Sequence, residues 1–161
     1  MTRGARSHSV SGTRLAARSR GAAAVAAVAL TGCGSSGPAV AALDGEGREY
    51  ASAPLPADGR FALTYRHSVY KATAEERFRA TDGGFELDAV ASRDGRVLDY
   101  YELDGDRTRE GDVWVLHPYE PAKFRTMPLA ATRRGQRTLV AGGQRVPLYG
   151  GPVHLRLVVE R

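Results

Sequence analysis

The amino-acid sequence predicts an all-β fold, either a small antiparallel β-sandwich or an open barrel. Three observations predict it: short runs with alternating apolar residues, turn signals at regular spacing between them, and no helical apolar period after Pro56. Several short strands separated in this way are typical of sandwiches and barrels. With 161 residues, 42% of them hydrophobic, the chain can form one compact core, and we expect a single β-rich domain over residues 57–161.

The expected strands follow one another with short connections. The first covers residues 61–65, where Phe61, Leu63 and Tyr65 alternate with small or polar residues. Turn dipeptides such as Asp82-Gly83 and Asp94-Gly95 separate the later ones. These later strands are expected at residues 76–80, 85–89, 97–103, 113–116, 139–140, 146–148 and 153–159.

The net charge of +5 has an uneven origin along the chain. Residues 1–32 contain five arginines and no acidic residue: Arg3, Arg6, Arg14, Arg18 and Arg20. The remaining 129 residues carry 18 basic and 18 acidic side chains and are formally neutral. We find no phosphate-binding loop, dinucleotide fingerprint or nucleic-acid motif. The domain therefore has no overall electrostatic preference for nucleic acid, and none is expected as a partner.

The N-terminus has the features of a secretory signal peptide. An arginine-rich stretch precedes the apolar run 21–30, which is shorter than the roughly 20 residues that span a bilayer. The run ends in Leu30-Thr31-Gly32-Cys33, which resembles the lipobox of bacterial lipoproteins, where cleavage leaves a diacylglyceryl-modified Cys first. We expect residues 1–32 to be removed and Cys33 to anchor the protein at the extracytoplasmic face of the membrane. The alternative is that Cys33, the single cysteine, is a free core residue after an ordinary helix.

Residues 33–56 are predicted to be a flexible tether. They begin with Gly, Ser and Pro, continue through an alanine-rich, acidic stretch, and show no apolar periodicity. Packed structure is expected to begin near Asp58-Gly59.

Four residues form a candidate site: His67, Ser68, Glu75 and Glu76. Strand parity places His67 on the same face as Phe61 and Leu63, and it places Glu76 inward with Phe78. The two side chains could therefore meet at the rim of the core. One interpretation is a hydrogen-bonded structural pair. The other is an acid/base dyad or a pair of metal ligands.

Other sequence features do not complete a catalytic site. Ser68 points away from His67 on a strand, and no G-x-S-x-G element is present, which argues against a serine hydrolase. His117 and His154 have no partner at metal-ligand spacing. We expect no metal and no cofactor, and a non-enzymatic protein is favoured. A small His/Glu-dependent or metal-dependent enzyme remains the alternative.

Aromatic and basic clusters are further candidates for binding. Tyr101 and Trp114 are expected in the core with Tyr100 half exposed, although the three could instead form an aromatic binding surface. The segment 132–137 contains three arginines around a glycine. It is predicted to be a solvated hairpin tip, with contact to anionic lipid or a partner as the alternative.

The segment Phe61–Lys71, which contains Tyr65-Arg66-His67-Ser68-Val69, is followed by Glu75-Glu76 and Phe78. This pattern resembles a bacterial family of uncharacterised small proteins, the domain of unknown function numbered eighteen-fifty, over about residues 55–161. Genes of that family often lie near TRAP-type solute transporters of the TAXI subgroup. The resemblance implies an extracytoplasmic accessory role, with a transporter component as a possible partner, and it supplies no activity.

Overall fold

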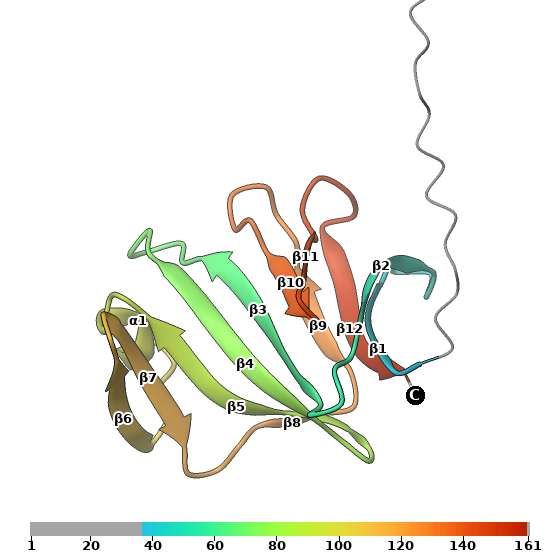
Figure 1. Cartoon of the computed structure of the whole chain (residues 1–161). Helices are drawn as coiled ribbons and strands as arrows, with labels where there is room; N and C mark the ends of the chain where they lie inside the picture. The colour runs from blue at the N-terminus through green and yellow to red at the C-terminus, as the bar shows by residue number, and fades with distance from the viewer. Residues whose placement is uncertain (1–36, 161) are drawn as a thin grey trace, which may run out of the picture. The chain divides into compact units, whose positions relative to one another are not determined.

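The computed structural model describes residues 37–160, so the predicted signal peptide and Cys33 lie outside the described residues. The domain is all-β, as predicted, and consists of two antiparallel sheets of four and eight strands that pack together (Figure 1). A sandwich of two sheets, rather than a single open barrel, is therefore the architecture. Within residues 37–160, no helix is both long and apolar enough to cross a membrane.

The smaller sheet contains a hairpin that the sequence did not predict. Its strand order is β2-β1-β12-β9, and the strands are β1 (Ala39–Leu43), β2 (Glu49–Pro54), β12 (His154–Glu160) and β9 (Met127–Ala130). The prediction of a flexible tether over residues 33–56 is thus wrong for β1 and β2. Val40 and Ala42 are completely buried, because β1 lies between β2 and β12 and turns one face to the core.

The larger sheet has the order β11-β10-β3-β4-β5-β7-β6, and β8 pairs with β5 off this path. All of its pairings are antiparallel. Its strands are β3 (Arg60–Arg66), β4 (Thr73–Thr81), β5 (Gly84–Ser92), β6 (Gly105–Glu110), β7 (Val113–Pro118), β8 (Lys123–Phe124), β10 (Thr138–Ala141) and β11 (Gln144–Pro147).

The main core lies between the two sheets. Phe61 and Phe78 stack with ring centroids 5.2 Å apart, and Phe85 meets both rings edge-on. Leu155 and Leu157 of β12 bury their side chains in the same cluster from the smaller sheet. The predicted inward parity of Phe61 and Leu63 is confirmed, since alternate residues of a strand point to the same face.

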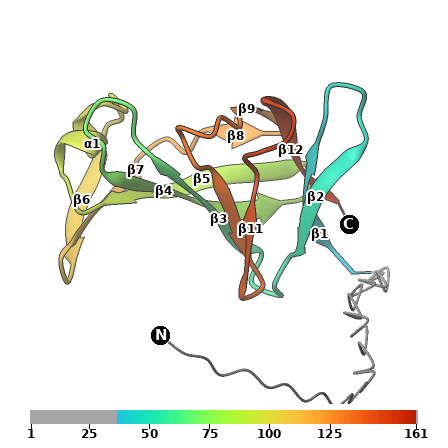
Figure 2. The same cartoon turned by 90° about the horizontal axis from the view of Figure 1, so that it is seen from above.

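A short helix stands where a strand was predicted over residues 97–103. Helix α1 (Arg96–Asp99) buries both Val97 and Leu98. Neighbouring residues of a strand point to opposite faces, whereas a helical turn lets both pack against Ala74 and Leu116. The result is a second apolar cluster, and Figure 2 shows α1 at the end of the large sheet far from β1 and β2.

Candidate functional site

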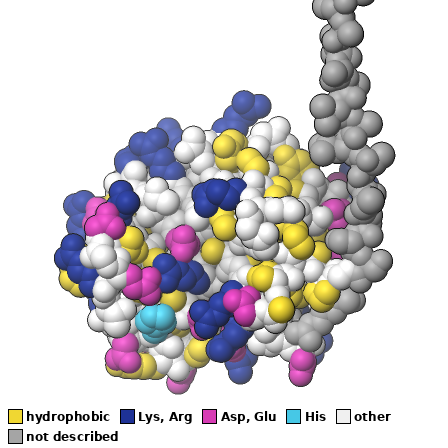
Figure 3. All heavy atoms as spheres, viewed as in Figure 1, with side chains coloured by type: hydrophobic (Ala, Val, Ile, Leu, Met, Phe, Trp, Pro, Cys, Tyr) yellow, Lys and Arg dark blue, Asp and Glu magenta, His cyan; other side chains and the backbone are white. Residues whose placement is uncertain are grey.

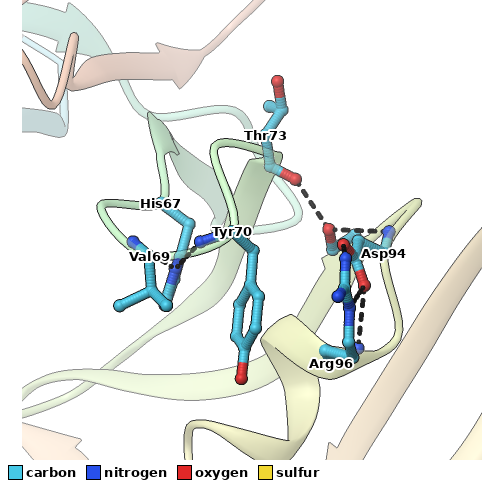
Figure 4. Close-up of polar contacts among 7 residues, drawn as sticks. His67, Val69, Tyr70, Thr73, Asp94 and Arg96 are labelled. Carbon is cyan, nitrogen blue, oxygen red and sulfur yellow. Dashed lines mark hydrogen bonds and ion pairs between the residues drawn. The ribbon is translucent and has the colours of Figure 1, made fainter.

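His67 organises the loop that joins β3 to β4. Its backbone N–H donates to the carbonyl of Ala72 at 2.8 Å, and its carbonyl accepts from the N–H of Lys71 at 3.0 Å. Lys71 adopts a left-handed backbone with φ 58° to close the turn. The imidazole Nδ1 accepts from the N–H groups of Val69 and Tyr70, both at 3.3 Å (Figure 4). The side chain thus satisfies loop amides that would otherwise lack partners.

The ring of His67 is packed by tyrosines. It stacks on Tyr70 with centroids 5.2 Å apart and meets Tyr100 edge-on at 4.7 Å, and the residue is 3% exposed. Val69 and Tyr100 remain 59% and 60% exposed. We call Val69, Tyr70 and Tyr100 the aromatic patch, because buried His67 links all three.

Glu76 lies in a different polar cluster, on the inner face of the large sheet opposite Leu63. The Tyr101 hydroxyl donates to Oε1 of Glu76 at 2.7 Å and is also hydrogen-bonded to the Tyr65 hydroxyl. Arg137 places Nη1 3.6 Å from Oε2 of Glu76, and its guanidinium lies 4.6 Å from the centre of the Tyr65 ring. We call Tyr65, Glu76, Tyr101 and Arg137 the tyrosine cluster.

The tyrosine cluster keeps its phenols protonated. Burial is the largest cause that raises the pKa of Tyr101, and the neighbouring Glu76 carboxylate raises it further. Burial also raises the pKa of Tyr65, against the lowering effect of its hydrogen bond to Tyr101. Both hydroxyls can therefore donate hydrogen bonds at neutral pH. Glu76 is held by a phenol and a guanidinium, and its side chain is only 14% exposed.

The structure does not bring the four predicted site residues together. Among residues 37–160, no hydrogen bond or ion pair joins His67 to Glu76. Glu75 lies on the opposite face of β4 and forms an ion pair with Nε of Arg77 at 2.7 Å. Ser68 is exposed, and its carbonyl accepts from Nζ of Lys71. The described part of the chain also contains no group of three His, Cys, Asp or Glu side chains placed to hold a metal ion.

Sequence reasoning placed Tyr65, Glu76 and Tyr101 toward the core but did not predict that they meet Arg137 there. Arg137 was predicted in a solvated hairpin tip, but its side chain is only 21% exposed and reaches across to β3 and β4. Tyr101 was expected in the core. Because a buried tyrosine hydroxyl needs a hydrogen-bond partner, its burial was the one sequence signal that a polar group lies beside it. Trp114, also expected in the core, is 37% exposed and lies under the guanidinium of Arg109 at 4.8 Å.

Comparison with known protein families, with curated proteins and with solved structures finds no match for this chain.

Proposed function

We propose that this protein is an exported lipoprotein, anchored through Cys33, whose β-sandwich is a non-enzymatic binding module for a membrane partner. The partner that we propose is a component of a solute transporter. The lipobox at residues 30–33 supports the anchor, and the resemblance to the eighteen-fifty family supports the kind of partner. The aromatic patch is the structural observation that carries the binding role.

The contacts of the acid–base candidates favour binding over catalysis. Nδ1 of His67 already accepts from two backbone amides, so the neutral ring carries its proton on Nε2 and has no free lone pair for a general base. Glu76 accepts a hydrogen bond from Tyr101 and forms a 3.6 Å ion pair with Arg137 inside the fold. The hydrogen bonds of His67 and Glu76 thus stabilise the fold, and they account for the burial of these two polar side chains.

The aromatic patch has the composition of a protein-binding surface. Tyrosines are enriched at the centres of interfaces, because a large ring contributes contact area with few rotatable bonds. Tyr100 and Val69 are largely exposed. His67 holds the backbone N–H of Val69 by a hydrogen bond, and its ring contacts the Tyr100 ring edge-on. A rigid apolar patch loses little conformational entropy when a partner covers it.

Site-specific crosslinking tests this proposal. A photoreactive amino acid is placed at Tyr100 in the full-length chain, and crosslinking is carried out in membranes of the native host. We expect an integral membrane transport protein to be recovered by mass spectrometry. The matched control is the same replacement at Tyr119, which is 67% exposed and lies in the loop after β7. Recovery of the same proteins from both positions would contradict the proposal.

A further inference from the structure

A hollow of about 450 Å³ opens on the outer face of the large sheet, where β3, β4, β10 and β11 come together. Three cations line it: Arg66 at the end of β3, Lys71 in the following loop and Arg145 on β11. We call it the basic hollow. The volume lies in the range of about 300–1,000 Å³ that is usual for small-molecule sites. In Figure 3, Lys and Arg side chains gather along the upper margin, where Figure 1 places the loops after β3 and before β10.

Among the described residues, the cations of the basic hollow have no carboxylate partner. Elsewhere in the domain, ion pairs hold Arg77, Arg79 and Arg96. Within residues 37–160, no Asp or Glu lies in ion-pair distance of Arg66, Lys71 or Arg145. Glu75 stands opposite Thr64 at the border of the hollow, and Arg77 neutralises it.

Neutral hydrogen-bonding groups surround the three charges. Arg145 donates from Nη2 to Oγ1 of Thr64 at 3.4 Å, so its guanidinium lies against the β3 side of the hollow. The other polar lining residues are Tyr65, Thr73, Gln136, Thr138 and Tyr149. A phosphate group carries up to two negative charges and offers several acceptor oxygens, and arginine forks match it in geometry. We propose that the basic hollow binds the phosphate group of a small phosphorylated molecule.

Two sources could supply this phosphate group, a soluble phosphate ester and the headgroup of a phospholipid. The hollow has the volume of a small-molecule site, so a soluble phosphate ester is the source that we infer.

Isothermal titration calorimetry of the purified full-length chain tests the inference. Glycerol 3-phosphate is the probe, and citrate is the comparison anion that carries charge without phosphate. We expect saturable binding of glycerol 3-phosphate that weakens at least about tenfold in the double variant Arg66→Gln/Arg145→Gln, because both lost guanidiniums donate charge-assisted hydrogen bonds. The control is Arg156→Gln, which removes an exposed arginine of the smaller sheet that has no ion-pair partner among residues 37–160.

A second arm distinguishes the two sources of phosphate. Vesicles of phosphatidylglycerol and of phosphatidylcholine are sedimented with each variant. Binding to phosphatidylglycerol that is lost in the double variant, without binding of glycerol 3-phosphate, would support phosphate recognition and overturn only the soluble source. Binding of citrate alone, or equal weakening in Arg156→Gln, would overturn phosphate recognition. Neither result bears on the crosslinking at Tyr100, so the two proposals fail separately. Circular dichroism of each variant confirms that the fold is retained.

Discussion

The hydroxyl of Tyr101 donates a 2.7 Å hydrogen bond to the carboxylate of Glu76. Tyr101 follows α1 and packs against both apolar clusters, the one between the sheets and the one beneath the helix. Glu76 lies in the middle of β4, on the face between these clusters. This bond therefore fastens the helical segment to the large sheet at the point where the two parts of the core meet.

Replacing Tyr101 by Phe removes that donor and leaves the ring in place. We expect the free energy of unfolding to fall by about 1–3 kcal/mol, because the largely buried carboxylate of Glu76 loses a hydrogen bond that water replaces poorly. Urea denaturation measures the change. The control is Tyr119→Phe, which loses a 2.8 Å bond to Asp106 at an exposed position and should have a much smaller effect. Equal losses in the two variants would contradict a special role for the tyrosine cluster.

Stability should fall at high pH in a way that depends on Tyr101. Folding raises the pKa of this phenol above its usual value of 10.0, mainly through burial, so the folded state holds its proton where the unfolded state has lost it. The stability that the protonated phenol contributes is fully present below about pH 10. Above that pH the free energy of unfolding declines by at most about 1.4 kcal/mol per pH unit for each such phenol. Urea denaturation between about pH 9 and pH 11 should show a shallower decline for Tyr101→Phe than for the native protein. Equal pH-dependent losses of stability in the native protein and in Tyr101→Phe would contradict a raised pKa for Tyr101.

Replacing His67 tests whether this residue is structural. We expect His67→Ala to destabilise the domain by about 2–4 kcal/mol, because both the ring packing and an acceptor for two amides are lost. Thermal melting measures this loss. His67→Asn should recover part of it, because the amide oxygen of Asn stands near the position of Nδ1. The exposed His117→Ala is the control. Unchanged melting of His67→Ala, together with loss of bound metal or of a measured turnover, would favour the enzyme alternative.

The sequence was informative where the side chains alternate in size. Phe61, Leu63 and Phe78 identify β3 and β4 because each inward position is large and apolar. The same parity places Glu76 inward, but it does not predict which groups contact the Glu76 carboxylate there. That information is absent locally, since Tyr101 and Arg137 reach Glu76 from 25 and 61 residues further along the chain.

The hairpin of β1 and β2 escaped prediction for a different reason. Its inward residues include Ala42 and Ala53, which are small and equally common in linkers. Burial of such residues contributes little individually, so the strand depends on backbone pairing with β12 from the far end of the chain. Helix α1 illustrates the same limit, because its adjacent Val97 and Leu98 fit a strand until Ala74 and Leu116 are seen beneath them.

Export and lipidation predict a defined mature mass. Intact-mass analysis of the membrane fraction should show a chain that begins at Cys33 and carries acyl groups, because two or more chains anchor a protein stably. In Cys33→Ser, the protein should leave the membrane fraction and keep its melting temperature, since the core of residues 37–160 is unchanged. An unprocessed Met1, or an unmodified Cys33 in the membrane fraction, would defeat the lipoprotein proposal.

Because β1 pairs with β2 and β12 in the smaller sheet, we predict that the folded domain begins at β1. A shortened chain that starts at Gly37 should fold, because it keeps both strands of the hairpin. A chain that starts at Ala57 should not fold cooperatively. It lacks the buried Val40 and Ala42 and leaves one edge of β12 unpaired, a loss of several kcal/mol from a total that is about 5–15 kcal/mol in ordinary domains. Circular dichroism and urea unfolding compare the two chains, and equal stability would show that residues 37–56 act as the tether that their composition indicates.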